Sequence, residues 1–144
     1  MANLFNLGLD PDVKEQQDFT IIEPGNYRAV IVKDDLKSTR NGNGKYLEIE
    51  IQIIEGKYSG EKIIDRLNII NQSMQAQNIG QGKLKRICKM LDAQYPPADT
   101  SDLYGKPFEI LVDIEEFISN NTGRTLQSNK VKSYNKIVET TQSW

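Results

Sequence analysis

The clearest pattern along the chain is the strict alternation of apolar and polar side chains over residues 46–53. Every second position holds a branched aliphatic residue, and these positions are Leu47, Ile49, Ile51 and Ile53. The positions between them hold one aromatic and three polar residues: Tyr46, Glu48, Glu50 and Gln52. A period of two predicts an antiparallel strand with one face in the core and the other in water.

Four more stretches predict strands. Residues 27–33 and 61–69 are rich in β-branched side chains, and each follows a turn that contains Pro or Gly. Residues 106–114 alternate again, whereas residues 125–134 alternate less regularly. Between these last two stretches, Asn120-Asn121-Thr122-Gly123 is typical of a hairpin turn.

The hydrophobic period changes over residues 73–92, where apolar side chains recur at helical spacing. Gly80 and Gly82 weaken the first half of this segment, so we expect two helical pieces with a bend. Tyr95-Pro96-Pro97 ends the helix, because proline cannot continue it. Four basic side chains decorate the helix and are interpreted as a solvated surface: Lys83, Lys85, Arg86 and Lys89.

The resulting order is strand–strand–strand–helix–strand–strand. This is the order of the oligonucleotide/oligosaccharide-binding (OB) fold, a five-stranded Greek-key barrel that binds ligands across strands two and three. We therefore predict a mainly β, OB-like barrel over residues 21–135, with a β-sandwich that carries an inserted helix as the alternative. Residues 1–20 are expected to form an N-terminal arm or short helix, in which Asp10-Pro11-Asp12 caps one turn. Residues 136–144 are expected to be a C-terminal tail.

Composition narrows the chemistry. The 144 residues include no His and one Cys, so neither a structural zinc site nor a His-dependent nucleophile is expected. The sequence contains no GxxxxGK[ST] loop, no GxGxxG turn and no EF-hand spacing. We therefore expect a binding protein, without catalytic activity and without a cofactor. No apolar run reaches about 18 residues and the N-terminus does not resemble a signal peptide, so we expect no membrane contact and a cytoplasmic location.

Charge is unevenly spread, although the formal net charge is only −2. Residues 71–95 carry four basic side chains and one acidic side chain, and residues 120–144 carry the same, which gives +3 for each. Residues 1–23 and 96–119 offset them with −4 and −5. Near-neutrality can thus conceal a basic face of the kind that nucleic-acid-binding proteins use.

In an OB-like barrel the first and fourth connections border the ligand, and here these are residues 37–45 and 119–124. Both are rich in Gly and Asn and carry basic side chains suited to phosphate, although a plain solvated turn explains them equally well. Exposed tyrosines nearby could stack on bases, at about 1–3 kcal/mol per base. The predicted nucleic-acid-binding residues are Lys37, Arg40, Lys45, Tyr46, Tyr58, Lys62, Arg66 and Arg124.

Two glutamates argue against a conventional binding groove. Glu48 and Glu50 share the predicted outer face with Tyr46, and their charges repel a phosphate backbone. If DNA crosses this face, Lys62 and Arg66 of the neighbouring strand must neutralise the two glutamates. Arg66 could instead have a purely structural role, as the ion-pair partner of a glutamate. The glutamates favour the alternative function, a protein-interaction module that recruits or regulates partner proteins without binding DNA.

Three segments of the chain are distinctive: Pro24–Tyr27, Lys37–Leu47 and Ile54–Ile69, the last containing Gly-Lys-Tyr-Ser-Gly-Glu-Lys and Asp-Arg-Leu-Asn. Together they resemble a family of small bacteriophage proteins catalogued as a domain of unknown function and encoded beside recombination and replication genes. The similarity covers roughly residues 18–135. It implies a phage protein in the infected bacterial host that binds single-stranded DNA in replication or recombination. Phage recombination or replication proteins are further expected partners, and a homo-oligomer is compatible with the sequence.

Overall fold

One antiparallel sheet and one α-helix dominate the part of the chain that the computed structural model describes, residues 2–12 and 21–137. The strands are β1 (Gly25–Ser38), β2 (Lys45–Ile53), β3 (Lys62–Ile70), β4 (Phe108–Ile118) and β5 (Thr125–Asn135). Helix α1 (Met74–Met90) and a 3₁₀ turn, η1 (Thr100–Leu103), connect β3 to β4. The strands lie in the order β3-β2-β1-β4-β5, so β3 and β5 are the edges of an open sheet. The predicted mainly β class, with five strands and a helix between the third and fourth, is confirmed.

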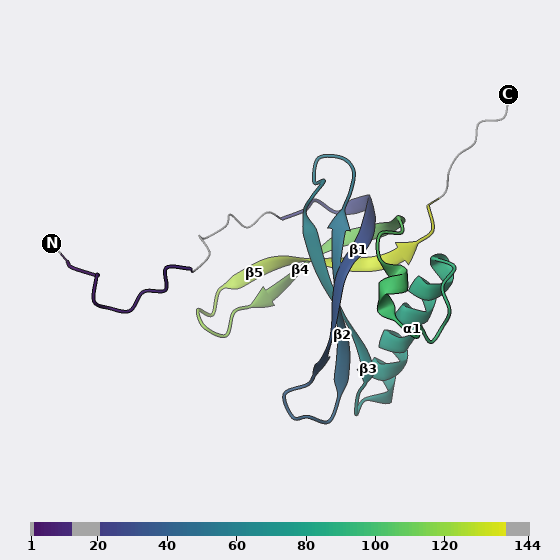
Figure 1. The fold of residues 1–144 in the computed structure, drawn as a ribbon, viewed down its shortest axis with the longest axis horizontal. Coiled ribbons are helices and arrows are strands. Elements are labelled where there is room, and N and C mark those ends of the chain that lie inside the picture. The colour runs from purple at the N-terminus through teal and green to yellow at the C-terminus, as the bar shows by residue number, and fades with distance from the viewer. Residues whose placement is uncertain (1, 13–20, 138–144) are drawn as a thin grey trace.

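The sheet changes direction strongly from one edge to the other. In Figure 1, β1, β2 and β3 run from top to bottom, whereas the β4–β5 hairpin runs across them and projects to the left. Helix α1 lies on the right of this view, where it contacts β3 and β5. The β1–β2 loop is at the bottom and the β2–β3 turn is at the top.

Strand β1 is longer than predicted. It continues past Lys33 to Ser38, because its backbone stays paired with β2 as far as Lys45. A β-bulge between Ile31 and Lys33 shifts the pairing by one residue, and such a bulge turns the following side chains to the opposite faces. Backbone pairing therefore holds the polar end of β1 in the sheet, and the first loop shrinks to residues 39–44.

Helix α1 is a single unbroken helix, so the predicted bend is wrong. Ser73 caps its start, since the Ser73 hydroxyl accepts a hydrogen bond of 3.3 Å from the amide of Ala76. Gly80 is buried where α1 crosses β3: a β-carbon placed there would lie 2.0 Å from the carbonyl oxygen of Asn68. This glycine permits close packing of helix on strand, whereas Gly82 faces open space. No helix among the described residues has both the length and the apolar character needed to cross a membrane.

The core lies between α1 and the inner face of the sheet. The four alternating aliphatic residues of β2 are all buried, as their period predicted. Ile87 and Cys88 of α1 and Phe108 of β4 have no exposed surface. The aliphatic faces of β2 and α1 therefore position the sheet with its other, polar face toward solvent.

Two carboxylates also point to the inner side of the sheet, and each is met by a tyrosine hydroxyl. Tyr134 of β5 donates a hydrogen bond of 2.5 Å to Asp65 of β3. Tyr104, which follows η1, donates one to Asp34 of β1. These contacts satisfy polar groups that would otherwise be costly beside an apolar core.

Residues 2–12 contain turns but no helix, and the Asp12 amide donates a hydrogen bond of 2.9 Å to the side chain of Asp10. An N-terminal helical turn is therefore not found there, while the rest of the predicted arm, residues 13–20, lies outside the described residues. Most of the predicted tail, residues 138–144, lies outside them too.

Candidate functional site

The outer face of β1, β2 and β3 is the polar surface on which most of the predicted site residues meet. Three rows of paired residues cross it, each with one residue from β1, one from β2 and one from β3. In that order the rows are Lys33, Glu50 and Ile64; Asp35, Glu48 and Arg66; and Lys37, Tyr46 and Asn68. The β-bulge before Lys33 places the three β1 members on this face. Lys62, opposite Gln52, adds a further cation at the edge strand. We call this set of residues the outer sheet face.

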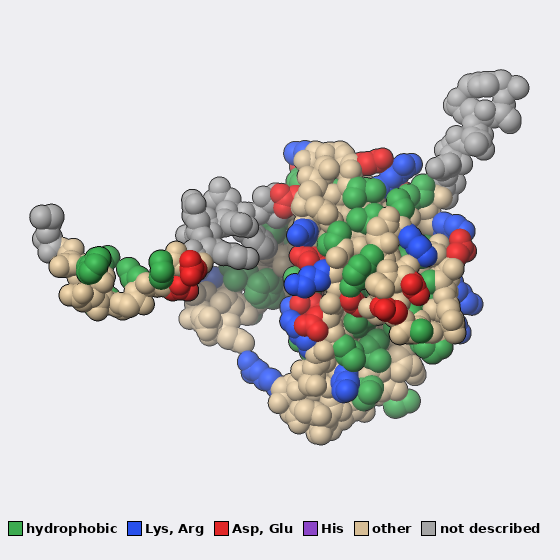
Figure 2. Space-filling view, viewed as in Figure 1, with side chains coloured by type: hydrophobic (Ala, Val, Ile, Leu, Met, Phe, Trp, Pro, Cys, Tyr) green, Lys and Arg blue, Asp and Glu red, His purple; other side chains and the backbone are tan. Residues whose placement is uncertain are grey.

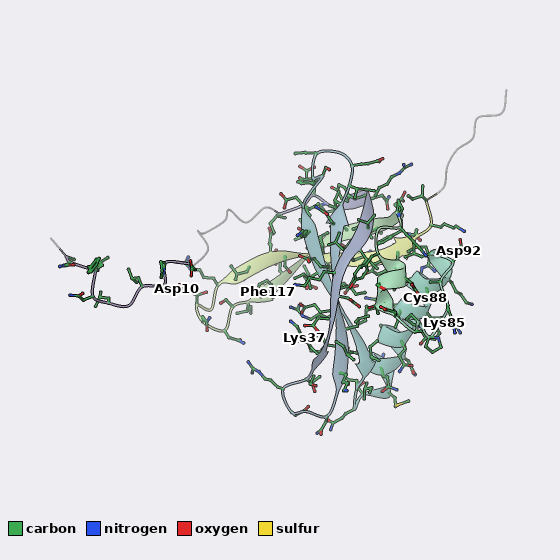
Figure 3. The ribbon with its side chains drawn as sticks, viewed as in Figure 1. Asp10, Lys37, Lys85, Cys88, Asp92 and Phe117 are labelled. Atoms are coloured by element: carbon green, nitrogen blue, oxygen red, sulfur yellow. The ribbon has the colours of Figure 1, made fainter. Side chains whose placement is uncertain are left out.

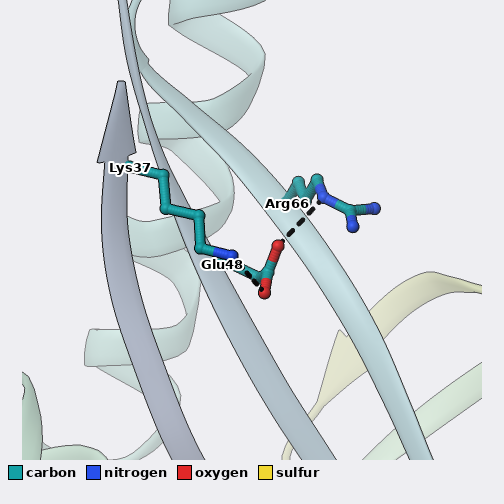
Figure 4. Close-up of polar contacts among 3 residues, drawn as sticks. All are labelled: Lys37, Glu48 and Arg66. Carbon is teal, nitrogen blue, oxygen red and sulfur yellow. Dashed lines mark hydrogen bonds and ion pairs between the residues drawn. The ribbon is translucent and has the colours of Figure 1, made fainter. Parts of the chain in front are cut away.

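Both glutamates of the outer sheet face are ion-paired with basic side chains from the flanking strands. Glu48 lies between two cations: its oxygens are 3.2 Å from Lys37 Nζ and 3.1 Å from Arg66 Nε (Figure 4). Glu50 lies 3.7 Å from Lys62 Nζ. Neutralisation of the two glutamates by Lys62 and Arg66, which a DNA path over this face requires, is thus present in the structure.

These contacts shift the proton equilibria of the central pair. The hydrogen bond from Lys37, together with the nearby charge of Arg66, holds the pKa of Glu48 below its ordinary value. The same hydrogen bond raises the pKa of Lys37. Glu48 is 19% exposed, whereas Lys37 and Arg66 are 42% and 62% exposed, so both pairs lie at the protein surface. Ion pairs at the surface contribute only about 0–1 kcal/mol to stability.

The β1–β2 loop forms a structured rim at one end of the outer sheet face. The Thr39 amide donates to the Gly44 carbonyl and the Gly44 amide to the Thr39 hydroxyl, both at 3.0 Å. A β-carbon on Gly44 would lie 2.7 Å from the Ile70 carbonyl oxygen, so this glycine lets the loop pack closely against the end of β3. Arg40 and Lys45 are exposed on the loop and at its exit.

The structure separates the predicted site residues into three groups. Lys37, Tyr46, Lys62 and Arg66 share the outer sheet face, and Arg40 and Lys45 lie at its β1–β2 end. Arg124 is exposed on the β4–β5 turn, which projects in a different direction from the β1–β2 loop (Figure 1). Figure 2 shows basic and acidic side chains interleaved on the left flank of the body, where Figure 3 places Lys37.

Tyr58 does not offer the exposed ring that was expected. It is only 9% exposed and packs edge-on against Tyr27, with ring centroids 5.8 Å apart. Tyr134 of β5 is buried as well, with 2% of its surface exposed. Both rings serve the core, which leaves the half-exposed Tyr46 as the aromatic group of the outer sheet face.

Lys33 is the site residue that sequence reasoning missed. It lies on the outer sheet face opposite Glu50, beside a shallow hollow of about 170 Å³ that Lys37, Glu48 and Ile64 also line. The extension of β1 beyond Lys33 and its β-bulge place it there, and neither has a clear signal in the amino-acid pattern. Among the residues that the structure describes, no three His, Cys, Asp or Glu side chains gather as a metal site.

The chain was compared with protein families and with curated proteins. No curated protein matches the chain. The profile of one family matches residues 10–143, which include every described strand and helix. The chain therefore belongs to the family described as "Protein of unknown function (DUF669)".

Proposed function

We propose that this chain is a phage single-stranded DNA-binding protein that supports DNA replication or recombination, and that its outer sheet face carries the strand. The proposal includes an OB-like Greek-key barrel as the finer description of the fold. It assigns a binding role, with no catalytic step. Phage origin and the genetic context are inferred from the sequence resemblance.

The strand order supports the barrel. Within the order β3-β2-β1-β4, the fourth strand returns by the long α1–η1 connection to lie beside the first, as in a Greek key. The two edges, β3 and β5, are linked by the hydrogen bond between Tyr134 and Asp65 rather than by a backbone ladder. A partly open barrel of this kind leaves the outer side of strands two and three accessible to a ligand.

The observation that carries the proposal is the pairing of both glutamates on the outer sheet face. Four cations, Lys33, Lys37, Lys62 and Arg66, share this face with three acids, and the β1–β2 end adds Arg40 and Lys45. Phosphates can take over the contacts that Glu48 and Glu50 now make. Tyr46, beside Lys37 and Asn68, is positioned to stack on a base.

Fluorescence polarisation of a labelled oligo(dT) at low and moderate salt tests the proposal. We expect saturable binding that weakens steeply with salt, and about four phosphate contacts predict a slope of about −3 for log K against log salt concentration. No binding at low salt would overturn the proposal.

Single substitutions test the assigned face. Arg40→Ala, Tyr46→Ala and Arg66→Gln should each weaken binding of oligo(dT). Lys57→Gln is the matched control, because it removes one positive charge in the β2–β3 turn, away from the outer sheet face. At moderate salt its affinity for oligo(dT) should stay within about twofold of that of the native chain. Equal effects from Lys57→Gln and Arg66→Gln would reject the site, even if the protein binds DNA.

A protein-interaction module remains the second candidate function, and one observation favours it. Phe117 and Leu126 lie opposite each other near the tip of the β4–β5 hairpin, 45% and 42% exposed, beside Ile118 at 70%. An exposed apolar cluster on a projecting hairpin suits a protein partner. Binding to a purified recombination protein from the same genome, lost in Phe117→Ser but unchanged in Arg66→Gln, together with no oligo(dT) binding, would favour this function.

A further inference from the structure

A second basic surface lies on the opposite side of the molecule from the outer sheet face. It is a hollow of about 500 Å³ between the second half of α1 and the end of β5. Lys85, Arg86 and Lys89 line it from the helix, and Tyr134 and Lys136 line it from the strand and its exit. Figure 3 places Lys85 on the right of the molecule and Lys37 on the left. We call this feature the α1–β5 pocket.

The fold creates this concentration of charge by joining two distant basic stretches. Residues 71–95 and 120–144 each carry a formal charge of +3, and the pocket forms where they meet. Among the residues that the structure describes, no acidic side chain lines the pocket and none of its four cations forms an ion pair. The outer sheet face differs in this respect, because there both glutamates are paired with cations. Clustered like charges repel one another, so a multivalent anion in the pocket gains from all four.

Arg86, which lines this pocket, is oriented by two hydrogen bonds. Its Nε donates a hydrogen bond of 2.7 Å to the Tyr134 carbonyl, and one terminal nitrogen donates one of 3.0 Å to the Asn135 side chain. Both acceptors are uncharged, so the guanidinium keeps its full charge and its remaining N–H groups. A guanidinium that is already oriented loses little freedom when it binds an anion, and its planar fork matches phosphate oxygens.

The helix itself works weakly against an anion here. The C-terminal end of a helix carries about half a negative charge. Lys89, in the last turn of α1, lies where it offsets this effect.

From this geometry we propose that the α1–β5 pocket binds a terminal phosphate group, that of a nucleotide or of the end of a nucleic-acid strand. A terminal phosphate carries close to two negative charges at neutral pH and has three strong acceptor oxygens. It therefore matches four cations and an oriented guanidinium better than a carboxylate with a single charge. The proposal does not rest on DNA binding by the outer sheet face, which lies elsewhere on the protein.

Calorimetric titration of the full chain with inorganic pyrophosphate at low salt tests the pocket. We expect saturable binding with one site. Lys89→Gln/Lys136→Gln should weaken it by about tenfold or more, since each substitution removes a charge-assisted contact. The control is Lys83→Gln/Lys132→Gln, which removes the same charge from α1 and β5 without touching the pocket, and it should change the affinity by less than about twofold. Absence of saturable binding, or equal weakening in the two double variants, would overturn the proposal.

Two further ligands distinguish a free nucleotide from the end of a nucleic-acid strand. If the pocket binds free nucleotides, thymidine monophosphate should bind without any attached strand. If it takes strand ends, a 3′-labelled oligo(dT) with a 5′-phosphate should bind more tightly than its 5′-hydroxyl counterpart, and Lys89→Gln/Lys136→Gln should abolish that difference. Hexaglutamate binding more tightly than all of these phosphates would overturn the proposal and assign the pocket to an acidic protein segment.

Discussion

The hydroxyl of Tyr134 donates a hydrogen bond of 2.5 Å to the carboxylate of Asp65, and this contact joins β5 to β3, the two edges of the open sheet. Tyr134 is almost fully buried. Burial, with the negative charge of Asp65 as a second cause, raises the pKa of Tyr134 well above its ordinary value. The contact therefore depends on the hydroxyl keeping its proton.

Tyr134→Phe should lower the free energy of unfolding by about 1–3 kcal/mol, because the inward-facing Asp65 loses its hydroxyl donor. Urea denaturation at neutral pH measures the change. Tyr46→Phe is the control, since no described residue makes a side-chain hydrogen bond with that hydroxyl, and it should change stability by less than about 0.5 kcal/mol. Equal stability of Tyr134→Phe and the native chain would show that the edge contact contributes nothing.

Alkaline pH should destabilise the protein through the same residue. The folded state binds the tyrosine proton more tightly than the unfolded state, so its contribution is complete below about pH 10 and is lost as the pH rises toward the folded pKa. Tyr27 and Tyr104 act in the same direction, because their pKa values are also raised. Urea denaturation between about pH 9 and about pH 11, on either side of the ordinary tyrosine pKa, measures this effect. The free energy of unfolding should fall more steeply with pH for the native chain than for Tyr134→Phe. Parallel curves would contradict this assignment.

The two helix glycines should respond oppositely to alanine. Gly80→Ala should destabilise the protein by about 1–3 kcal/mol, because its β-carbon would overlap the backbone of Asn68 and force α1 away from β3. Gly82→Ala should stabilise it by about 0.5–1 kcal/mol, since that position is open and alanine favours a helix. Thermal unfolding of the two single variants shows whether each one is less or more stable than the native chain. A stabilising Gly80→Ala would show that helix and strand can separate without cost.

Removing a charge from the outer sheet face should strengthen DNA binding. Glu48→Gln releases Lys37 and Arg66 and removes a repulsive charge, and one such interaction at contact distance is worth about 1 kcal/mol in water, or about fivefold in affinity. Glu55→Gln is the control, because it also removes an ion-paired glutamate. Glu55 lies in the β2–β3 turn, 3.5 Å from Arg28 of β1. Oligo(dT) affinity at low salt is the measurement. An unchanged affinity for Glu48→Gln would place the DNA path elsewhere.

The order of elements could be predicted because it depends on local periodicity. The alternation around Ile49 and Ile51 predicted β2 almost to the residue. Two features depended instead on packing and pairing between elements. β1 extends to Ser38 because β2 pairs with it. Helix α1 continues through Gly80, where it packs on β3, although helix propensity alone assigns glycine a penalty.

The candidate site was predictable in part for the same reason. Alternation put Tyr46 and Glu48 on a common face, and a neighbouring strand was expected to supply Arg66. The burial of Tyr58 depends on its contact with Tyr27, more than 30 residues away along the chain. The α1–β5 pocket likewise depends on the helix meeting the end of β5, so its basic residues had the pattern of an ordinary solvated helix surface.

Cys88 gives the molecule a built-in probe of its own opening. It is the only cysteine of the chain, it has no exposed surface, and burial raises the pKa of its thiol. An alkylating reagent needs both access and a thiolate, and Cys88 offers them only when α1 leaves the sheet. The rate of alkylation under native conditions therefore reports the free energy of that opening, with no engineered label and no second thiol to confuse the signal.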